Sequence, residues 1–255
     1  MAKGAKARGK RIAFGDRQKI LWDHNSETIF RGNPNIAQPG DEQATDLQWI
    51  AFYKKSRLYN EHDKANHRWL WNHDFRAIPG EMCFSADEAK AANQWGRGFV
   101  IIEPNVPDKL GAVNKAWPLD RYQAVAHKLQ RDGYDVRQFS FGKHRLDVKQ
   151  ISAPSFRHAA RVLKNAALYI GPEGGLHHAS AAVGVPAVVM FGGWIPPAIT
   201  GYSEHTNLTG GATEFCGSLG KCPHCAAHMD AISINEVYQS CLRSLSPEAP
   251  ATLAP

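Results

Sequence analysis

Two adjacent glycines, Gly174 and Gly175, lie between a short apolar run and a helix of small residues. The apolar runs on either side, residues 167–170 and 187–191, are partly β-branched and bounded by Gly or Pro, which is typical of strands buried on both faces. Glycine lets a ligand approach the backbone, and the first N–H groups of the following helix have no partner within that helix. Such a turn suits a diphosphate and therefore indicates a nucleotide-linked ligand. Similar turns also occur for packing alone, and no GxGxxG or GxxxxGK[ST] pattern is present. Two interpretations of the turn therefore stay open: a phosphate-binding site and a purely structural turn.

Length and composition limit the class of protein. The chain has 255 residues, of which 43% are hydrophobic and 21% charged, so it can form one large domain with a small additional lobe. No apolar stretch approaches the roughly 18 residues of a membrane span, and the first residues lack the apolar segment of a secretory signal. Five cysteines, an odd number, favour reduced thiols over a disulfide framework. We therefore expect a cytoplasmic protein.

Residues 98–245 alternate between strand-like and helix-like segments. Strands are predicted at residues 99–103, 134–139, 167–170 and 187–191, and helices at residues 119–131, 156–165 and 234–245. This alternation predicts a parallel sheet with right-handed crossovers. Ligands of such sheets bind beyond the carboxyl ends of the strands.

Residues 11–97 differ, because short β-like runs are separated by turn-rich stretches. Strands are predicted at residues 12–14, 19–22, 28–30, 49–53 and 69–71. The one clear helix, residues 85–95, starts with Ser85 as N-cap and Glu88 in the capping-box position. We expect a small β-rich lobe here.

The two ends of the chain are predicted to be tails. Residues 1–10 read as a basic disordered tail and residues 246–255, rich in Pro and Ala, as a loose tail. Much of the positive charge behind the net charge of +6 lies near the N-terminal end of the sequence. Such a basic segment either improves solubility or attracts a polyanion.

Several motifs in residues 85–245 resemble glycosyltransferase family 9, the lipopolysaccharide heptosyltransferase-like enzymes. In chain order they are Pro104-Asn105 after a strand, residues 115–118 (Lys-Ala-Trp-Pro), the turn at 171–182, and the strand at 185–192 followed by a cysteine-bearing loop and a helix. The resemblance implies an α/β, GT-B-like fold. In this fold a Rossmann-like parallel-sheet domain on the C-terminal side binds the nucleotide sugar. The family has a larger domain on the N-terminal side that presents the acceptor, so we expect the small lobe at residues 11–97 to present the acceptor here.

The resemblance also implies which residues contact the donor. By position they are Asn105, Lys115, Glu173, Gly174, Gly175, Leu176, His178 and Gly192. Lys115 is in addition a catalytic candidate, since a fixed cation stabilises the charge that develops on a departing diphosphate. Glu173 stands where the family usually has Asp, so its contact with the donor sugar is open. Alternatively, Lys115 is a solvated lysine at a helix start and His178 a structural histidine.

The catalytic base implied by the resemblance is an aspartate in a Gly-Asp turn after the first strand. Gly15-Asp16 is the possible counterpart. A carboxylate is suited to this role because the acceptor hydroxyl loses its proton as it attacks. Gly-Asp turns are common, however, and Asp23, Glu27 and Asp74 are rival candidates.

The cysteine-bearing loop has metal-ligand types at short spacing. Cys216, Cys222, Cys225 and His228 would suit a tetrahedral zinc ion, but a second, separated CxxC pair is missing. Packed reduced thiols are the favoured interpretation, and no metal ligand is assigned.

These observations favour a glycosyltransferase that moves a sugar from a nucleoside-diphosphate sugar to an acceptor hydroxyl, with inversion and without a required cofactor. The acceptor is open: a glycan, a lipid-linked molecule, or a polyanion including nucleic acid. The alternative is a non-catalytic module that binds a nucleotide or sugar nucleotide, consistent with the atypical N-terminal part. A NAD-dependent dehydrogenase is disfavoured by the absence of the glycine fingerprint.

Overall fold

The computed structural model describes residues 2–51, 58–107, 109 and 111–246. The chain forms two compact units. The first comprises Met1–Arg57 with Glu81–Ala91, and the second comprises Leu58–Gly80 with Ala92–Pro255. The predicted lobe at 11–97 is therefore divided between the two units.

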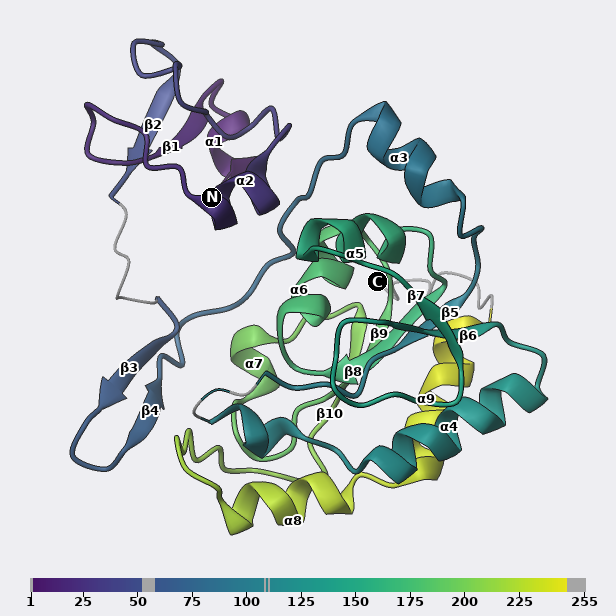
Figure 1. Ribbon diagram of the computed structural model, residues 1–255. Coiled ribbons are helices and arrows are strands. Elements are labelled where there is room, and N and C mark those ends of the chain that lie inside the picture. Colours follow the sequence, from purple (N-terminus) through teal and green to yellow (C-terminus); the bar gives the residue numbers. More distant parts are fainter. Residues whose placement is uncertain (1, 52–57, 108, 110, 247–255) are drawn as a thin grey trace, which may run out of the picture. The chain divides into compact units, whose positions relative to one another are not determined.

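A parallel six-stranded sheet forms the centre of the second unit (Figure 1). Its strands are β5 (Val100–Ile102), β6 (Val136–Phe139), β7 (Lys149–Ile151), β8 (Leu168–Pro172), β9 (Ala187–Met190) and β10 (His205–Leu208). Their order across the sheet is β10-β9-β8-β5-β6-β7, and every neighbouring pair is parallel. The chain runs from β5 outward to β7 and then returns to β8 on the other side of β5. The strand order thus reverses between β5 and β8, which is where open α/β sheets bind ligands.

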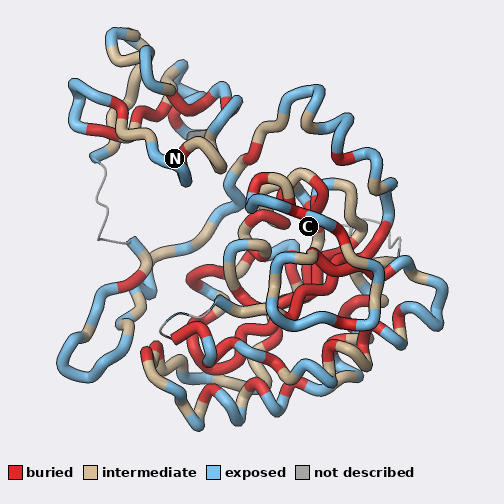
Figure 2. The backbone as a smooth tube through the Cα atoms, in the orientation of Figure 1, coloured by how far each residue is buried: buried red, intermediate tan, exposed pale blue. Residues whose placement is uncertain are grey.

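Helices cover this sheet and bury its side chains. They are η1 (Ala112–Lys115, a 3-10 helix), α4 (Leu119–Arg131), α5 (Phe156–Leu163), α6 (Gly175–Ala182), α7 (Pro197–Thr200), α8 (Pro223–Ala231) and α9 (Ile234–Leu245). The apolar face predicted for α4 is confirmed, because Tyr122, Val125, Ala126 and Leu129 are fully buried in the main core. Figure 2 shows the buried backbone concentrated in the strands of this sheet. The predicted α/β, Rossmann-like architecture on the C-terminal side is confirmed.

A β-hairpin of the N-terminal half also belongs to the second unit. β3 (Asn60–Asp63) and β4 (Arg68–Trp71) pair antiparallel. The hairpin is hydrogen-bonded to the loop that follows β10: Trp69 N donates to Gly217 O at 2.8 Å, and Leu219 N donates to His67 O at 3.1 Å. These bonds explain why the hairpin does not group with the small lobe.

The first unit is built around a parallel pair of strands, β1 (Arg11–Phe14) and β2 (Leu47–Ile50). Two short helices, α1 (Ala2–Lys6) and α2 (His24–Phe30), accompany them. The disordered tail predicted at 1–10 is wrong for residues 2–6, because Ala5 is fully buried against Ile12 and Ile36. The loose tail was predicted at residues 246–255, of which 247–255 lie outside the described residues.

Three other predictions in this unit are corrected. Residues 28–30 end α2 instead of forming a strand, since the Asp23 carboxylate caps this helix by accepting a hydrogen bond from Ser26 N at 2.8 Å. Residues 19–22 contribute only an isolated bridge between Gly15 and Ile20. The strand predicted at 49–53 begins earlier and ends at Ile50, and residues 52–57 lie outside the described residues.

The capping box at the start of α3 (Ala86–Asn93) is confirmed. Glu88 N donates to Ser85 Oγ at 3.2 Å, and Ser85 N donates to a Glu88 carboxylate oxygen at 3.0 Å. Among the described residues, no helix combines the length and apolar character needed to cross a membrane.

Candidate functional site

A cavity of about 590 Å³ lies at the carboxyl ends of β5, β6, β7 and β8. Its walls come from the loops after these four strands: Glu103, Asn105, Val106 and Pro107, then residues 141–144, residues 153–156 and residues 172–176, together with Tyr169 of β8. The cavity includes the point where the strand order reverses. Its position is therefore the one expected for a ligand of a doubly wound sheet.

The glycine turn forms one wall of this cavity, as expected. Gly174 directly precedes α6, and no side chain of the described residues caps the N-terminus of that helix. A Cβ atom added at Gly174 would meet nothing within 4 Å, whereas one at Gly175 would lie 3.2 Å from the Phe156 ring. Open space at Gly174 beside uncapped N–H groups is a suitable environment for an anion. At Gly175 an added side chain would also crowd the Phe156 ring.

Lys115 and Glu173 form a buried ion pair at the edge of the cavity. Lys115 ends η1, and its Nζ lies 2.7 Å from Glu173 Oε2, with the two side chains only 10% and 7% exposed. The ammonium also lies 4.9 Å from the centre of a Trp194 ring. Burial opposes ionisation of Glu173, but Lys115 and His178 outweigh it and hold the pKa of Glu173 well below its usual value. Glu173 lines the cavity. Lys115 is not among the lining residues but contacts the Glu173 carboxylate directly.

His178 of α6 lies on the other side of the same carboxylate. Its Nε2 is 3.5 Å from Glu173 Oε1, and its Nδ1 is 2.8 Å from the hydroxyl of Tyr202. A hydroxyl that donates to Nδ1 leaves the ring proton on Nε2, which faces Glu173. Burial raises the pKa of Tyr202 to about 12, so its hydroxyl keeps its proton at neutral pH. Tyr202 was not identified from the sequence, since it lies in a loop after α7 with no motif around it.

His177 is fully buried next to His178. Neither of its ring nitrogens has a hydrogen-bond partner within the described part of the chain. Burial, with a smaller contribution from His178, lowers the pKa of His177 to about 2, so the ring is neutral. Glu173, His177 and His178 offer atoms within 4.8 Å of one another that could bind a metal. Because the Lys115 ammonium already neutralises Glu173, we assign no metal to this group.

Glu103 is a buried carboxyl group at the end of β5 that sequence reasoning missed. It is 2% exposed; Oε1 accepts hydrogen bonds from the backbone and side chain of Asn105, while Oε2 has no partner among the described residues. Burial raises the pKa of Glu103 to about 7 despite the bonds from Asn105. The sequence feature that could have identified Glu103 is its position, a charged residue directly after an apolar strand. Because Glu103 lines the cavity, it is a candidate contact for a ligand.

Asn105 supports the neighbouring loop as well as lining the cavity. Its side-chain Oδ1 accepts from His144 N at 2.8 Å, and its Nδ2 donates to His144 O at 3.1 Å. These bonds fix the loop that carries Phe141, which is 51% exposed. Phe141 and Phe156 give the cavity exposed aromatic side chains, which the sequence did not distinguish from core residues.

The remaining predicted site residues are divided between the cavity and other places in the chain. Leu176 lines it, but Gly192 does not: a Cβ atom at Gly192 would lie 2.5 Å from Met229 Sδ, and its φ of 57° favours glycine, so this position serves packing and a turn. Asp16 belongs to the first unit, where its Oδ1 accepts from the backbone N–H groups of Gln18 and Lys19 at 2.9 and 2.8 Å. These bonds lower the pKa of Asp16.

Two of the three rival carboxylates, Asp23 and Glu27, have structural hydrogen bonds, and the third, Asp74, is exposed. Asp23 caps α2, and Glu27 accepts from Trp22 Nε1 at 2.9 Å. Asp74 is exposed in the second unit. The catalytic base therefore stays a prediction.

Taken together, the six-stranded parallel sheet and the cavity at its strand-order reversal define a doubly wound α/β domain with a cavity at the usual ligand position. The chain matches the model of glycosyltransferase family 9 (heptosyltransferase) over residues 79–218. Since this match covers more than half of the chain, the protein belongs to glycosyltransferase family 9. The predicted GT-B-like assignment agrees with this membership.

Several solved structures are similar to part of the chain. ADP-heptose lipopolysaccharide heptosyltransferase II of E. coli and a family 9 glycosyltransferase of Veillonella parvula each show 16% identity and a TM-score of 0.49, covering 65% of this chain and 53% of theirs. The E. coli heptosyltransferase WaaC, solved with ADP-2-deoxy-2-fluoro heptose, shows 16% identity and a TM-score of 0.43 over 58% of this chain and 43% of its own. The chain thus matches about half the length of these enzymes. None of the curated proteins matches it.

Proposed function

We propose that this protein transfers a sugar from a nucleoside-diphosphate sugar to an acceptor hydroxyl. The observation that carries the proposal is the cavity at the strand-order reversal, where open backbone at Gly174 and the uncapped start of α6 meet the Lys115–Glu173 pair. Membership of family 9 supports the same activity. ADP-heptose is the first donor to test, because it appears in the name of E. coli heptosyltransferase II, one of the similar structures.

The leaving group of this reaction is a diphosphate, and the site offers two sources of positive charge for it. One is the N-terminus of α6, whose N–H groups and dipole favour an anion. The other is the ammonium of Lys115, fixed by Glu173 and Trp194. Fixed positive charge is most effective where negative charge develops in the transition state. We therefore propose that the diphosphate departs without a divalent ion bound to it.

Inversion at the sugar carbon requires a base that removes the proton of the acceptor hydroxyl as it attacks. Asp16 is our proposed base, with Asp23, Glu27 and Asp74 as the alternatives. Asp16 has one carboxylate oxygen, Oδ2, outside its two turn-forming hydrogen bonds. The acceptor we propose is a glycan, a lipid-linked molecule or a polyanion such as nucleic acid, and a polyanion would show strongly salt-dependent binding.

The test is release of nucleoside diphosphate from ADP-, GDP-, UDP- and CDP-sugars, with and without candidate acceptors. We expect one donor class to be bound and turned over, and Gly174→Val to weaken binding and turnover. Saturable binding without turnover over a broad range of acceptors would favour the non-catalytic binding module. Failure to bind any of these nucleotides would refute the proposal.

A further inference from the structure

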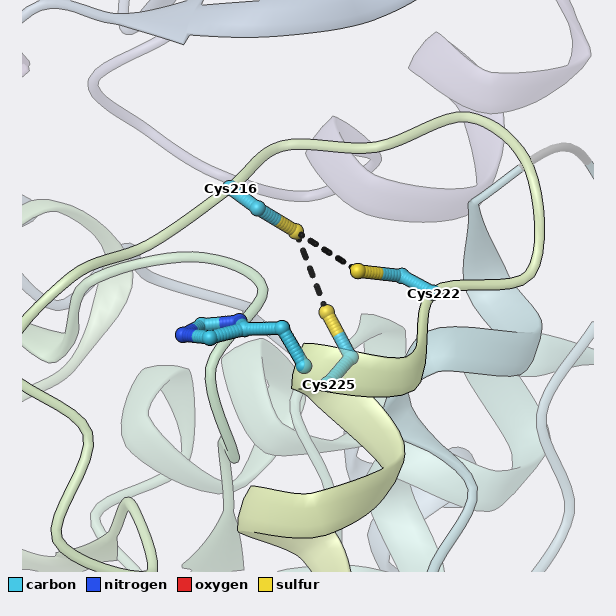
Figure 3. Close-up of side chains that lie close together, drawn as sticks. Cys216, Cys222 and Cys225 are labelled. Carbon is cyan, nitrogen blue, oxygen red and sulfur yellow. Dashed lines mark hydrogen bonds between the residues drawn. The ribbon is translucent and has the colours of Figure 1, made fainter.

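Three cysteines and a histidine converge beside helix α8. Cys216 comes from the loop after β10, Cys222 directly precedes α8, and His224 and Cys225 lie in its first turn. The sulfur of Cys216 is 3.6 Å from that of Cys222 and 3.2 Å from that of Cys225 (Figure 3). With His224, the four possible ligand atoms all lie within 4.8 Å of one another.

These separations fit ligands around a metal ion. With metal–sulfur bonds of about 2.3 Å in a tetrahedron, two sulfurs lie about 3.7 Å apart. A disulfide would need about 2.05 Å, and an odd set of three thiols cannot all be paired. All three cysteines are free thiols in the structure. The arrangement is therefore closer to a coordination sphere than to a disulfide.

The surroundings of the ligand atoms agree with this interpretation. His224 Nδ1 is buried and has no hydrogen-bond partner among the described residues. Ser218 N donates to Cys216 Sγ at 3.4 Å, a bond that favours a thiolate. His228, the histidine expected from the spacing, instead has its Nδ1 2.9 Å from Gly210 O. Of the two histidines, His224 is therefore the one placed beside the three sulfurs.

We propose that Cys216, Cys222, His224 and Cys225 bind one tetrahedrally coordinated transition-metal ion, with zinc as the ion that three thiolates and one imidazole suit best. Four protein ligands fill the coordination sphere and leave no position for a substrate. The site is therefore structural. The evidence for this site does not rest on the proposed sugar transfer, and the site does not require a metal at the diphosphate.

The bonds of the loop indicate what the metal stabilises. Ser218 O accepts from Trp194 Nε1 at 2.7 Å and from Asn114 Nδ2 at 3.0 Å, and Cys222 N donates to Asn114 Oδ1 at 3.0 Å. Asn114 precedes Lys115, and Trp194 lies beneath the Lys115 ammonium. A metal that fixes this loop would therefore help to position Lys115. The same loop holds the hairpin β3–β4 through its backbone.

The experiment measures metal content in the full chain, purified without added metal or chelator. Elemental analysis should find about one zinc ion per chain in the wild type. Cys222→Ser and Cys225→Ser should each lose most of it, and His224→Asn should weaken retention against a competing chelator. His228→Asn and Cys83→Ser are matched controls, which should retain the metal, since neither residue is among the proposed ligands.

The wild-type stoichiometry keeps the proposal testable even where a variant fails to fold. One iron ion per chain, lost in the same variants, would support the site and replace zinc as its ion. Wild-type protein without stoichiometric zinc, iron or another transition metal would overturn the proposal. So would a folded Cys216→Ser/Cys222→Ser variant that retains the metal.

Discussion

Lys115→Met removes the cation from a buried ion pair and should affect both stability and turnover. The side chain of its partner Glu173 is 7% exposed, and its Oε2 lies 2.7 Å from Lys115 Nζ. Removing one member of a buried pair typically costs about 3–5 kcal/mol, because the remaining charge is left without compensation. We expect a loss of this size in the free energy of unfolding, measured by urea denaturation at neutral pH.

The loss of stability caused by Lys115→Met should grow as pH rises. In the wild type the pKa of Glu173 lies below its usual value, so the pair stabilises the fold above the unfolded pKa and loses this effect only as pH falls through the folded pKa. Without Lys115, burial should raise the pKa of Glu173, and ionisation then destabilises the fold as pH rises. The difference between wild type and variant should therefore be larger at pH 8 than at pH 5.

A double variant separates stability from catalysis. Lys115→Met/Glu173→Gln leaves no buried charge in the pair, so it should recover most of the lost stability. Turnover should stay low by a factor of about 10²–10³, because no cation faces the departing diphosphate, while donor affinity should change less. Unchanged stability of Lys115→Met would contradict the buried pair. Restored turnover in the double variant would show that Lys115 only neutralises Glu173.

Three further predictions concern other parts of the molecule. Gly174→Val should leave the protein folded but weaken nucleotide binding more than 10-fold in isothermal titration, since the added side chain enters the open cavity, and unchanged affinity would place the diphosphate elsewhere. Because the pKa of Glu103 is raised to about 7, its ionisation should lower the wild-type free energy of unfolding by up to about 3 kcal/mol between pH 5 and pH 8, and Glu103→Gln should abolish this slope. Asp16→Asn keeps an oxygen that can accept the two turn-forming hydrogen bonds, so it should retain fold and donor affinity while losing about 10²–10⁴-fold in turnover. Near-normal turnover of Asp16→Asn would contradict Asp16 as the base and would leave Asp23, Glu27 and Asp74 as the candidates.

The sheet was predictable from the sequence where its strands are fully buried. β5, β8 and β9 appear as short apolar runs, and all their residues are buried. The two edge strands, β7 and β10, were not predicted. They contain polar and partly exposed residues, so neither a continuous apolar run nor clean alternation marks them.

The first unit was predicted less well because its elements are short and local hydrogen bonds decide them. Residues 28–30 have β-forming side chains, yet the cap at Asp23 starts a helix that includes them. The helix at residues 2–6 depends on burial of Ala5 against residues distant in the sequence. Such tertiary contacts cannot be inferred from a local pattern.

The candidate site was predictable in its turn and its lysine, but not in its remaining walls. Gly174, Glu173 and Lys115 lie in recognisable motifs, and the structure brings them to one place. Glu103 and Phe156 come from different loops, and only the parallel order of the strands brings these loops together. Likewise, the distinction between His224 and His228 depends on side-chain direction at the start of α8, which residue spacing does not determine.

The most direct test of the central claim is an experimental structure of the protein with the nucleoside diphosphate that binds best. We predict that the diphosphate lies at Gly174 and the first N–H groups of α6, with the Lys115 ammonium within contact distance and the nucleoside in the cavity beside Phe156. A nucleotide bound away from this turn, with Lys115 still paired only to Glu173, would contradict it.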